Sequence, residues 1–176
     1  RYFSSAASDV YKRQYLDYPL NQIGGIHLNT IEFMNDVHPI RKKSEANDFI
    51  KRTDLIKEVY QGVLADLEKQ AKSGIYPPEF VYGHVIKQLD EFIEYSNEEH
   101  PLYTQFMSKI NQLDLDQEDV NYFENEIKRS ISESVTPGFK VLRDFMIRTQ
   151  KYANKNHGIW SQPGGDEYYK LKIRTF

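Results

Sequence analysis

The amino-acid sequence predicts an all-α protein, a bundle-like array of amphipathic helices, on the strength of three observations. Apolar residues recur at steps of three and four through most of the chain, the spacing that gives a helix one apolar stripe. Proline and glycine stand between these stretches, where helices begin and end. No stretch shows the sustained apolar–polar alternation of a half-buried strand, so we predict no sheet.

The composition is that of a globular chain with many aromatic residues. Its 176 residues suffice for one domain or a large part of one, and its 13 Tyr and 10 Phe predict an aromatic-rich core. The formal net charge of -3 leaves no basic excess, which disfavours binding to nucleic acid. The absence of Cys excludes disulfides and thiolate chemistry. No apolar run approaches the roughly 18 residues needed to span a bilayer, and the compartment, cytoplasmic or exported, stays open.

The N-terminal part divides into a tail and a short structured segment. Residues 4–14, SSAASDVYKRQ, resemble a translated sequencing adaptor, and we expect residues 1–14 to be an artefactual or disordered tail. An extended stretch around Pro19 and a Gly24-Gly25 turn follow. We predict a short helix over 30–36, closed by the residue before Pro39, because that position avoids the helical region.

The central helices are predicted from caps and breakers. One helix runs from an N-cap at Ser44 to a C-terminal Gly74, and a second begins at Pro77-Pro78 and stops near Asn97. A shorter helix begins at Pro101. Asp116 caps a long helix that continues to Gly158, with a kink or break near Thr136 where Pro137-Gly138 interrupts it.

The histidines of this region do not form a metal-binding pattern. We interpret His27 and His38 as surface or turn residues rather than ligands, because no acidic residue stands in helical register with either. His84, beside Val85 and Ile86, is interpreted as a core or boundary residue. Glu98, Glu99 and His100 are adjacent in sequence, so their side chains point in different directions and do not form a site.

The last stretch, Gly158 to Phe176, carries the most distinctive residues. It contains the only Trp, Trp160, then a Pro-Gly-Gly turn, an acidic pair in the first turn of a helix, and two adjacent Tyr. Such a turn could contact a substrate. The residues alone favour the other interpretation, an ordinary helix-to-helix corner in which Trp160 plugs the packing.

Three stretches of the chain together resemble one bacterial family, the domain of unknown function 885. They are TyrProLeuAsnGlnIleGlyGly at 18–25, which leads through His38-Pro39-Ile40 into the helix at Ser44; SerValThrProGlyPheLysValLeu at 134–142; and GlyIleTrpSerGlnProGlyGlyAspGluTyrTyr at 158–169. The resemblance covers residues 15–176 in order. It implies that this region is the N-terminal helical part of a larger metallopeptidase-like domain, truncated at its C-terminus.

The resemblance also implies a zinc-dependent metallopeptidase as the full-length parent. In that family a His-Glu-x-x-Pro-Gly-His-His helix follows the Gly-Gly-x-Glu-Tyr-Tyr stretch, and two His one helical turn apart bind zinc while Glu polarises the bound water. This motif is absent here. No catalytic residue or metal ligand is therefore carried over, zinc is expected only in the parent, and we predict that this fragment alone is inactive.

The site residues that the resemblance carries over are Gly164, Gly165, Tyr168 and Tyr169. It implies that the turn borders a cleft for a peptide substrate, where a Tyr hydroxyl donates a hydrogen bond to a carbonyl or oxyanion. In the other interpretation both rings pack and the glycines cap a helix. The expected partner is the missing C-terminal part of the parent chain. As a fragment, the chain is expected to expose apolar patches that favour self-association. The alternative function is a stand-alone helical protein-interaction module, which a monomeric and cooperatively folded chain would favour.

Overall fold

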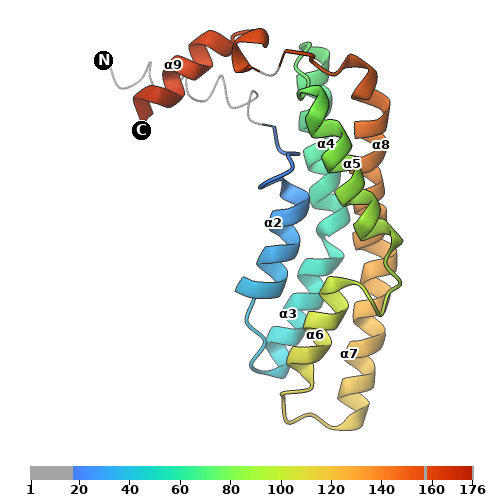
Figure 1. The fold of residues 1–176 in the computed structure, drawn as a ribbon. Helices are drawn as coiled ribbons and strands as arrows, with labels where there is room; N and C mark the ends of the chain where they lie inside the picture. Colours follow the sequence, from blue (N-terminus) through green and yellow to red (C-terminus); the bar gives the residue numbers. More distant parts are fainter. Residues whose placement is uncertain (1–17, 157, 176) are drawn as a thin grey trace.

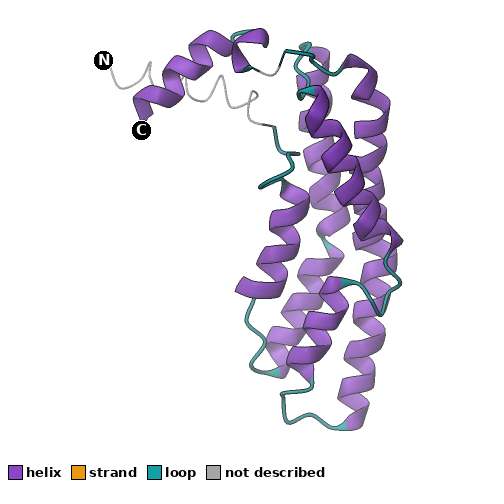
Figure 2. Ribbon diagram, in the orientation of Figure 1, coloured by secondary structure: helices purple, strands orange, loops and turns teal. Residues whose placement is uncertain are grey.

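The computed structural model describes residues 18–156 and 158–175, and in these ranges the chain is a helical bundle (Figure 1, Figure 2). The tail predicted for residues 1–14 lies outside the described residues. The elements, in chain order, are α2 (Ile26–Glu32), the π-helical η2 (Phe33–Val37), α3 (Lys43–Asp54), α4 (Ile56–Lys72), α5 (Glu79–Glu94), α6 (Pro101–Ile110), α7 (Gln117–Ser130), the π-helical η3 (Ile131–Val135), α8 (Thr136–Thr149), the 3-10 turns η4 (Gln150–Tyr152) and η5 (Ile159–Ser161), and α9 (Gly165–Thr175).

Two long columns form the frame of the bundle. One column is α3 followed by α4, the other is α7, η3 and α8, and α5 and α6 run alongside these columns in the opposite direction (Figure 1). α8 packs against both α4 and α5. Helix α9 leaves one end of the bundle and projects to the side (Figure 1). Within the described residues no strand is present, only an isolated parallel bridge between Pro78 and Asn154. The predicted all-α class is confirmed.

The core is one continuous apolar cluster that runs from Leu20 to Met146. Its centre is aromatic, as the composition predicts: the ring centroids of Phe49 and Phe106 lie 4.9 Å apart, and so do those of Phe92 and Phe139. Burying one such ring contributes roughly 1.5–3 kcal/mol. The core residues come from every helix between α2 and α8, so this part of the chain packs around its own interior.

The helix predicted from 44 to 74 is two helices, because the chain breaks at Leu55. The break leaves the carbonyl of Asp54 and the N–H of Lys57 without helical partners, and the hydroxyl of Ser134 binds both. It donates to the Asp54 oxygen at 2.8 Å and accepts from the Lys57 N–H at 3.1 Å. Ser134, from the column of α7, η3 and α8, thereby stabilises the break, since buried backbone groups need hydrogen-bond partners.

The predicted N-cap at Ser44 is also wrong. The extended residue before α3 is Lys42, with φ of -157°, and Ser44 lies inside the helix. Glu45 supplies the polar group at this end instead, because its Oε2 accepts the Arg41 N–H at 2.7 Å. At the other end of the column, Gly74 follows α4 with φ of 73°, as predicted for a C-terminal glycine.

The interruption predicted near Thr136 takes the form of the π-helical segment η3. The Thr136 N–H donates to the carbonyl of Ile131, five residues back, and Pro137 then lies in the first turn of α8, where its missing N–H is tolerated. α8 ends at Thr149, so the prediction that this element continues to Gly158 is wrong: the chain turns through η4 before reaching it.

The N-terminal helix begins earlier than predicted, and three histidines lie where the sequence did not predict them. α2 begins at Ile26 rather than at residue 30, and η2 extends it to Val37. His27 and His38 are buried, not at the surface, whereas His84 is exposed, not in the core. Burial lowers the pKa of both buried imidazoles, which favours their neutral forms.

Candidate functional site

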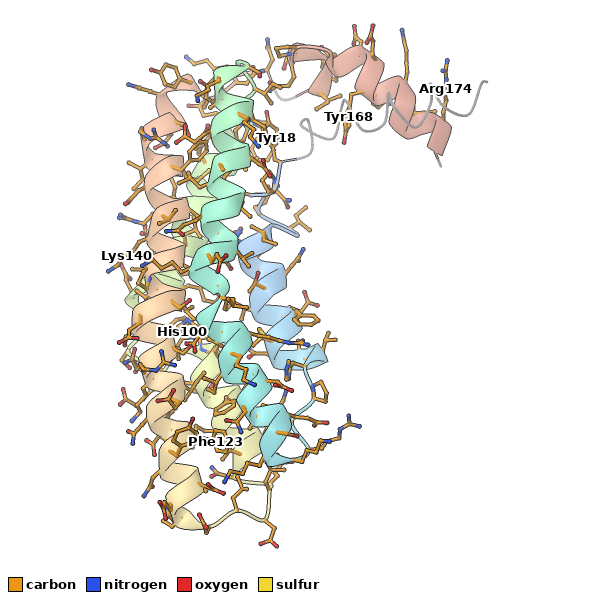
Figure 3. The ribbon with its side chains drawn as sticks, turned by 180° about the vertical axis from the view of Figure 1, so that it is seen from behind. Tyr18, His100, Phe123, Lys140, Tyr168 and Arg174 are labelled. Carbon is orange, nitrogen blue, oxygen red and sulfur yellow. The ribbon has the colours of Figure 1, made fainter. Side chains whose placement is uncertain are left out.

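Two of the three motif stretches meet at one end of the bundle, on the loop between α4 and α5. The carbonyl oxygen of Tyr76 in this loop accepts hydrogen bonds from the Tyr18 hydroxyl and from Nε2 of Gln162, the latter at 2.8 Å. Burial raises the pKa of the Tyr18 hydroxyl, so it stays protonated as a donor. Figure 3 labels Tyr18 and, on α9, Tyr168 at this same end. We call this region the motif end.

An apolar contact reinforces the polar junction. Ile75 and Tyr168 are buried against each other, with Tyr18 and Ile159 packed around them. This small cluster is separate from the main core, and it attaches the first turns of α9 to the α4–α5 loop. The position of α9 therefore depends on residues from three distant parts of the sequence.

Both glycines of the turn are required by local geometry. Gly164 has φ of 74°, in the left-handed region that L side chains rarely adopt. Gly165 is the first residue of α9, and a Cβ at this position would lie 1.7 Å from the carbonyl oxygen of Ile159. The Gly165 N–H donates to the Gln162 carbonyl at 2.9 Å. The Pro-Gly-Gly turn thus sets the direction in which α9 leaves the bundle.

The tyrosine doublet points in two directions. Tyr168 is 8% exposed and packs on Ile75, whereas its neighbour Tyr169 is 58% exposed. Adjacent helical residues are about 100° apart around the axis, so one can face the bundle while the other faces solvent. The four site residues implied by the resemblance are therefore together in one turn, and Tyr169 presents the accessible phenol.

Trp160 does not plug the packing of a corner. Its side chain is 70% exposed, and its ring lies over its own loop, because a Cβ at Gly158 would be 2.1 Å from the ring atom Cη2. The corner is held instead by Asn154, whose Nδ2 donates to the Ser161 hydroxyl at 2.7 Å and whose carbonyl accepts the Glu79 N–H at 3.0 Å. The motif end therefore exposes the indole of Trp160 and the phenol of Tyr169 next to a corner that hydrogen bonds hold in place.

Four residues of this junction were not predicted from the sequence: Tyr18, Tyr76, Asn154 and Gln162. Each acts through a partner far away in the chain, and the Tyr18–Tyr76 and Gln162–Tyr76 contacts span 58 and 86 residues. No short-range pattern encodes such contacts. The only local signal is that Tyr18 and Gln162 each belong to a stretch that carries the family resemblance.

The described residues do not supply a zinc site. In 18–156 and 158–175 no three His, Asp or Glu side chains lie close enough together to hold a metal ion. The buried imidazoles serve the fold: His27 Nε2 donates to Gln88 Oε1 at 3.0 Å, His38 Nδ1 donates to the Pro39 carbonyl at 2.9 Å, and His100 Nδ1 accepts the Leu102 N–H at 3.1 Å. Within the same residues, no helix has the length and apolarity to cross a membrane.

The fold and the motif end define an all-helical bundle protein in which a projecting helix begins at a glycine-containing turn. The chain belongs to the domain of unknown function 885 family, described as bacterial proteins of unknown function, whose model matches residues 1–176. A crystal structure of a candidate lipoprotein from Colwellia psychrerythraea is similar, with a TM-score of 0.86 and 26% identity over 89% of this chain. The match spans only 27% of that protein's length. No curated protein matches the chain.

Proposed function

We propose that this chain is the N-terminal helical scaffold of a longer, zinc-dependent metallopeptidase-like hydrolase, and that the motif end forms one wall of its substrate cleft. The observation that carries the proposal is the position of Tyr169: the residue is 58% exposed on the first turns of a helix whose start packs on Ile75 through Tyr168. The length of the similar structure, of which this chain covers about a quarter, supports a scaffold role within a longer polypeptide.

In this proposal each residue of the turn has a distinct role. Tyr169 donates a hydrogen bond to a peptide carbonyl or to the oxyanion that develops from it. Tyr168, packed on Ile75, orients its neighbour. Gly164, with its positive φ, and Gly165, against the Ile159 carbonyl, form the turn that sets the direction of the helix carrying Tyr169. Trp160 adds an exposed apolar ring beside the turn.

The metal belongs to another part of the longer polypeptide in this proposal, because the described residues fit no zinc ligand set. We therefore assign no metal-binding or proton-transfer step to any residue of this chain, and Tyr169 acts only as a hydrogen-bond donor to the substrate. Its contribution is to binding and orientation, which can supply a large part of a rate enhancement when the reacting groups are held in place.

The first test is to extend the reading frame downstream of the Phe176 codon. The proposal predicts an in-frame His-Glu-x-x-His or its Pro-Gly extension within roughly the length of another domain. A stop codon directly after Phe176 would contradict it.

The second test uses that longer protein with a fluorogenic peptide as substrate. We expect activity that 1,10-phenanthroline abolishes and zinc restores. Tyr169→Phe should lower kcat/KM about 10- to 100-fold, the effect of losing one oxyanion donor of moderate strength. Tyr122→Phe is the matched control, since Tyr122 is 50% exposed on α7 and outside the motif end. Equal kinetics for both variants would remove the substrate role of Tyr169.

The alternative function, a stand-alone helical protein-interaction module, is favoured by one specific observation. An apolar groove with half-exposed side chains runs between η2 and the junction of α3 and α4. A stop codon after Phe176 would leave this as the function to pursue, because docking of a helix in an apolar groove is a recurring mode of protein recognition.

A further inference from the structure

The groove lies between the α2–η2 segment and the α3–α4 junction and has a volume of about 370 Å³. Met34 and Ile56 are buried beneath it, and its rims include Phe33, Leu55 and Val59, which are 44%, 51% and 50% exposed. Surface residues of this kind are normally scattered singly, so a contiguous apolar groove indicates a docking surface.

One cationic side chain, that of Arg52, lines this groove. The guanidinium of Arg52 lies 5.8 Å from the centroid of the Phe33 ring, over its face. Along the wall formed by α3 and α4, Arg52, Leu55, Ile56 and Val59 line the groove; Ile56 is buried, and the other three follow one another at a step of three and then four. At about 1.5 Å per residue, this wall presents a charge and two apolar side chains over roughly 10 Å.

Helix α9 carries the complementary pattern. Asp166, Tyr169 and Ile173 are all exposed, the last two at 58% each, and they follow one another at the same step of three and then four. Residues at this spacing lie on one face of a helix. The face thus presents an anion followed by two apolar side chains, over the same length of roughly 10 Å.

The α9 helix of the same chain does not reach the groove. Tyr168 is anchored on Ile75 in the loop after α4, and the last residue of α4, Lys72, lies 13 residues beyond Val59 and therefore about 20 Å further along the helix axis. Ile173 lies only five residues beyond Tyr168, about 8 Å of helix. Figure 1 also shows α9 leaving from the end of the bundle rather than along its side.

We propose that the groove binds α9 of a second copy of this chain. In this arrangement Asp166 of one copy pairs with Arg52 of the other, Tyr169 lies against Leu55 and Phe33, and Ile173 lies against Val59. Reciprocal docking of both α9 helices closes a two-fold dimer, because each copy contributes one groove and one helix. This inference goes beyond the proposed function and does not depend on it.

The test begins with the oligomeric state of the full chain, measured by light scattering over a range of concentrations. We expect twice the chain mass of 20.8 kDa at high concentration. Val59→Glu should weaken the dimer at least tenfold, since it places a charge in the apolar contact. Ile147→Glu is the matched control: Ile147 is 45% exposed, but on α8. A monomer at every concentration, or equal dissociation of both variants, would overturn the proposal.

Charge exchange and cross-linking test the register. Arg52→Asp and Asp166→Arg should each weaken the dimer, and the double variant should restore it, because the pair is then reversed rather than lost. The chain has no Cys, so Val59→Cys with Ile173→Cys should oxidise to a disulfide-linked dimer, whereas Ile147→Cys with Ile173→Cys should not. No restoration by the double variant, or equal cross-linking of the two Cys pairs, would contradict this register.

The two proposals share Tyr169, which the dimer covers, so they are distinguished through other residues. Val59 and Arg52 lie outside the motif end, and Val59→Glu changes the dimer contact while leaving Tyr169 unchanged. Peptidase activity is therefore measured on Val59→Glu as well as on the unchanged protein, and a dimer without activity, or activity in a monomer, shows which of the two proposals has failed.

Discussion

Gly138 of α8 lies against the ring of Tyr60 on α4: a Cβ at Gly138 would be 3.1 Å from Cδ2 of Tyr60 and 3.2 Å from the Cα of Lys57. The missing side chain lets the two long columns approach closely at the level of the break in the first column. The glycine that follows Pro137 therefore belongs to helix packing, not to the interruption of the helix.

The first prediction is that Gly138→Ala lowers the free energy of unfolding by about 1–3 kcal/mol, because the added methyl meets backbone that cannot move away. Gly62 is the control, since it lies inside α4 and a Cβ there would meet nothing within 4 Å. Gly62→Ala should instead raise the free energy by about 0.5–1 kcal/mol through helix propensity. Urea unfolding measures both, and a stabilised Gly138→Ala would refute the close approach.

The second prediction concerns Gly165, whose Cβ position overlaps the Ile159 carbonyl oxygen. We expect Gly165→Ala to displace α9, since neither backbone can yield locally, and to change the fluorescence of Trp160 next to the turn. Hydrogen exchange of the α9 amides should accelerate. Gly74→Ala, at φ of 73° in open space, should cost only about 1 kcal/mol and leave that fluorescence unchanged. Slow α9 exchange in Gly165→Ala would contradict the assignment.

The third prediction is that His100 makes the free energy of unfolding fall as the solution becomes acidic. Burial lowers its pKa to about 4, and its Nδ1 accepts the Leu102 N–H in the neutral form. The pKa of histidine in the unfolded chain is about 6.5, so the folded state favours the neutral ring. This contribution is complete above pH of about 6.5 and is lost as the pH falls toward about 4, on the order of 3 kcal/mol in total.

Asn is the substitution that tests His100, because its side chain can still accept the Leu102 N–H at the helix N-cap but does not titrate. We expect His100→Asn to reduce the dependence of unfolding free energy on pH between about 4 and 6.5. His84→Asn controls for the removal of an imidazole from the exposed side of α5. An equal pH slope in His100→Asn and the unchanged protein would count against the buried neutral ring.

The fourth prediction concerns Arg129, which links α7 to the end of α3. Its Nη2 lies 2.9 Å from Asp54 Oδ2 and 3.0 Å from Glu126 Oε2. Arg129→Met should destabilise the protein by about 1–2 kcal/mol, since one guanidinium serves several carboxylates, and high salt should reduce the difference. Lys51→Met, in the exposed pair with Asp48, should have little effect. The two variants unfolding at the same urea concentration would contradict the prediction.

Much of the bundle follows from apolar spacing alone. Phe123 and Ile127, four residues apart on the helix that Asp116 caps, are fully buried, and the Asp116 side chain accepts the Asp119 N–H at 2.8 Å. These features depend on neighbours within one or two helical turns, which a sequence displays directly. The all-α class and the starts of α5, α6 and α7 follow for the same reason.

The mistaken predictions concern features that distant residues decide. The break at Leu55 depends on Ser134, whose hydroxyl bonds to Lys57 across 77 positions of sequence. The burial of His27 depends on Gln88, which lies 61 positions away on α5. His84 was misplaced because its apolar neighbour Val85 is one step, about 100°, away around the helix.

In the candidate site, too, some features depend on near neighbours in the sequence and others on distant residues. The spacing of glycine, acidic and aromatic residues is local information, so the sequence predicts that the Gly164-Gly165 turn leads directly into a helix carrying Tyr168 and Tyr169. The burial of one tyrosine and the exposure of the other follow from the folded arrangement, since they depend on Ile75, a partner 93 positions away from Tyr168 on the α4–α5 loop. Contacts of that range arise when folded helices bury their apolar faces, and no single stretch contains both sides of such a contact.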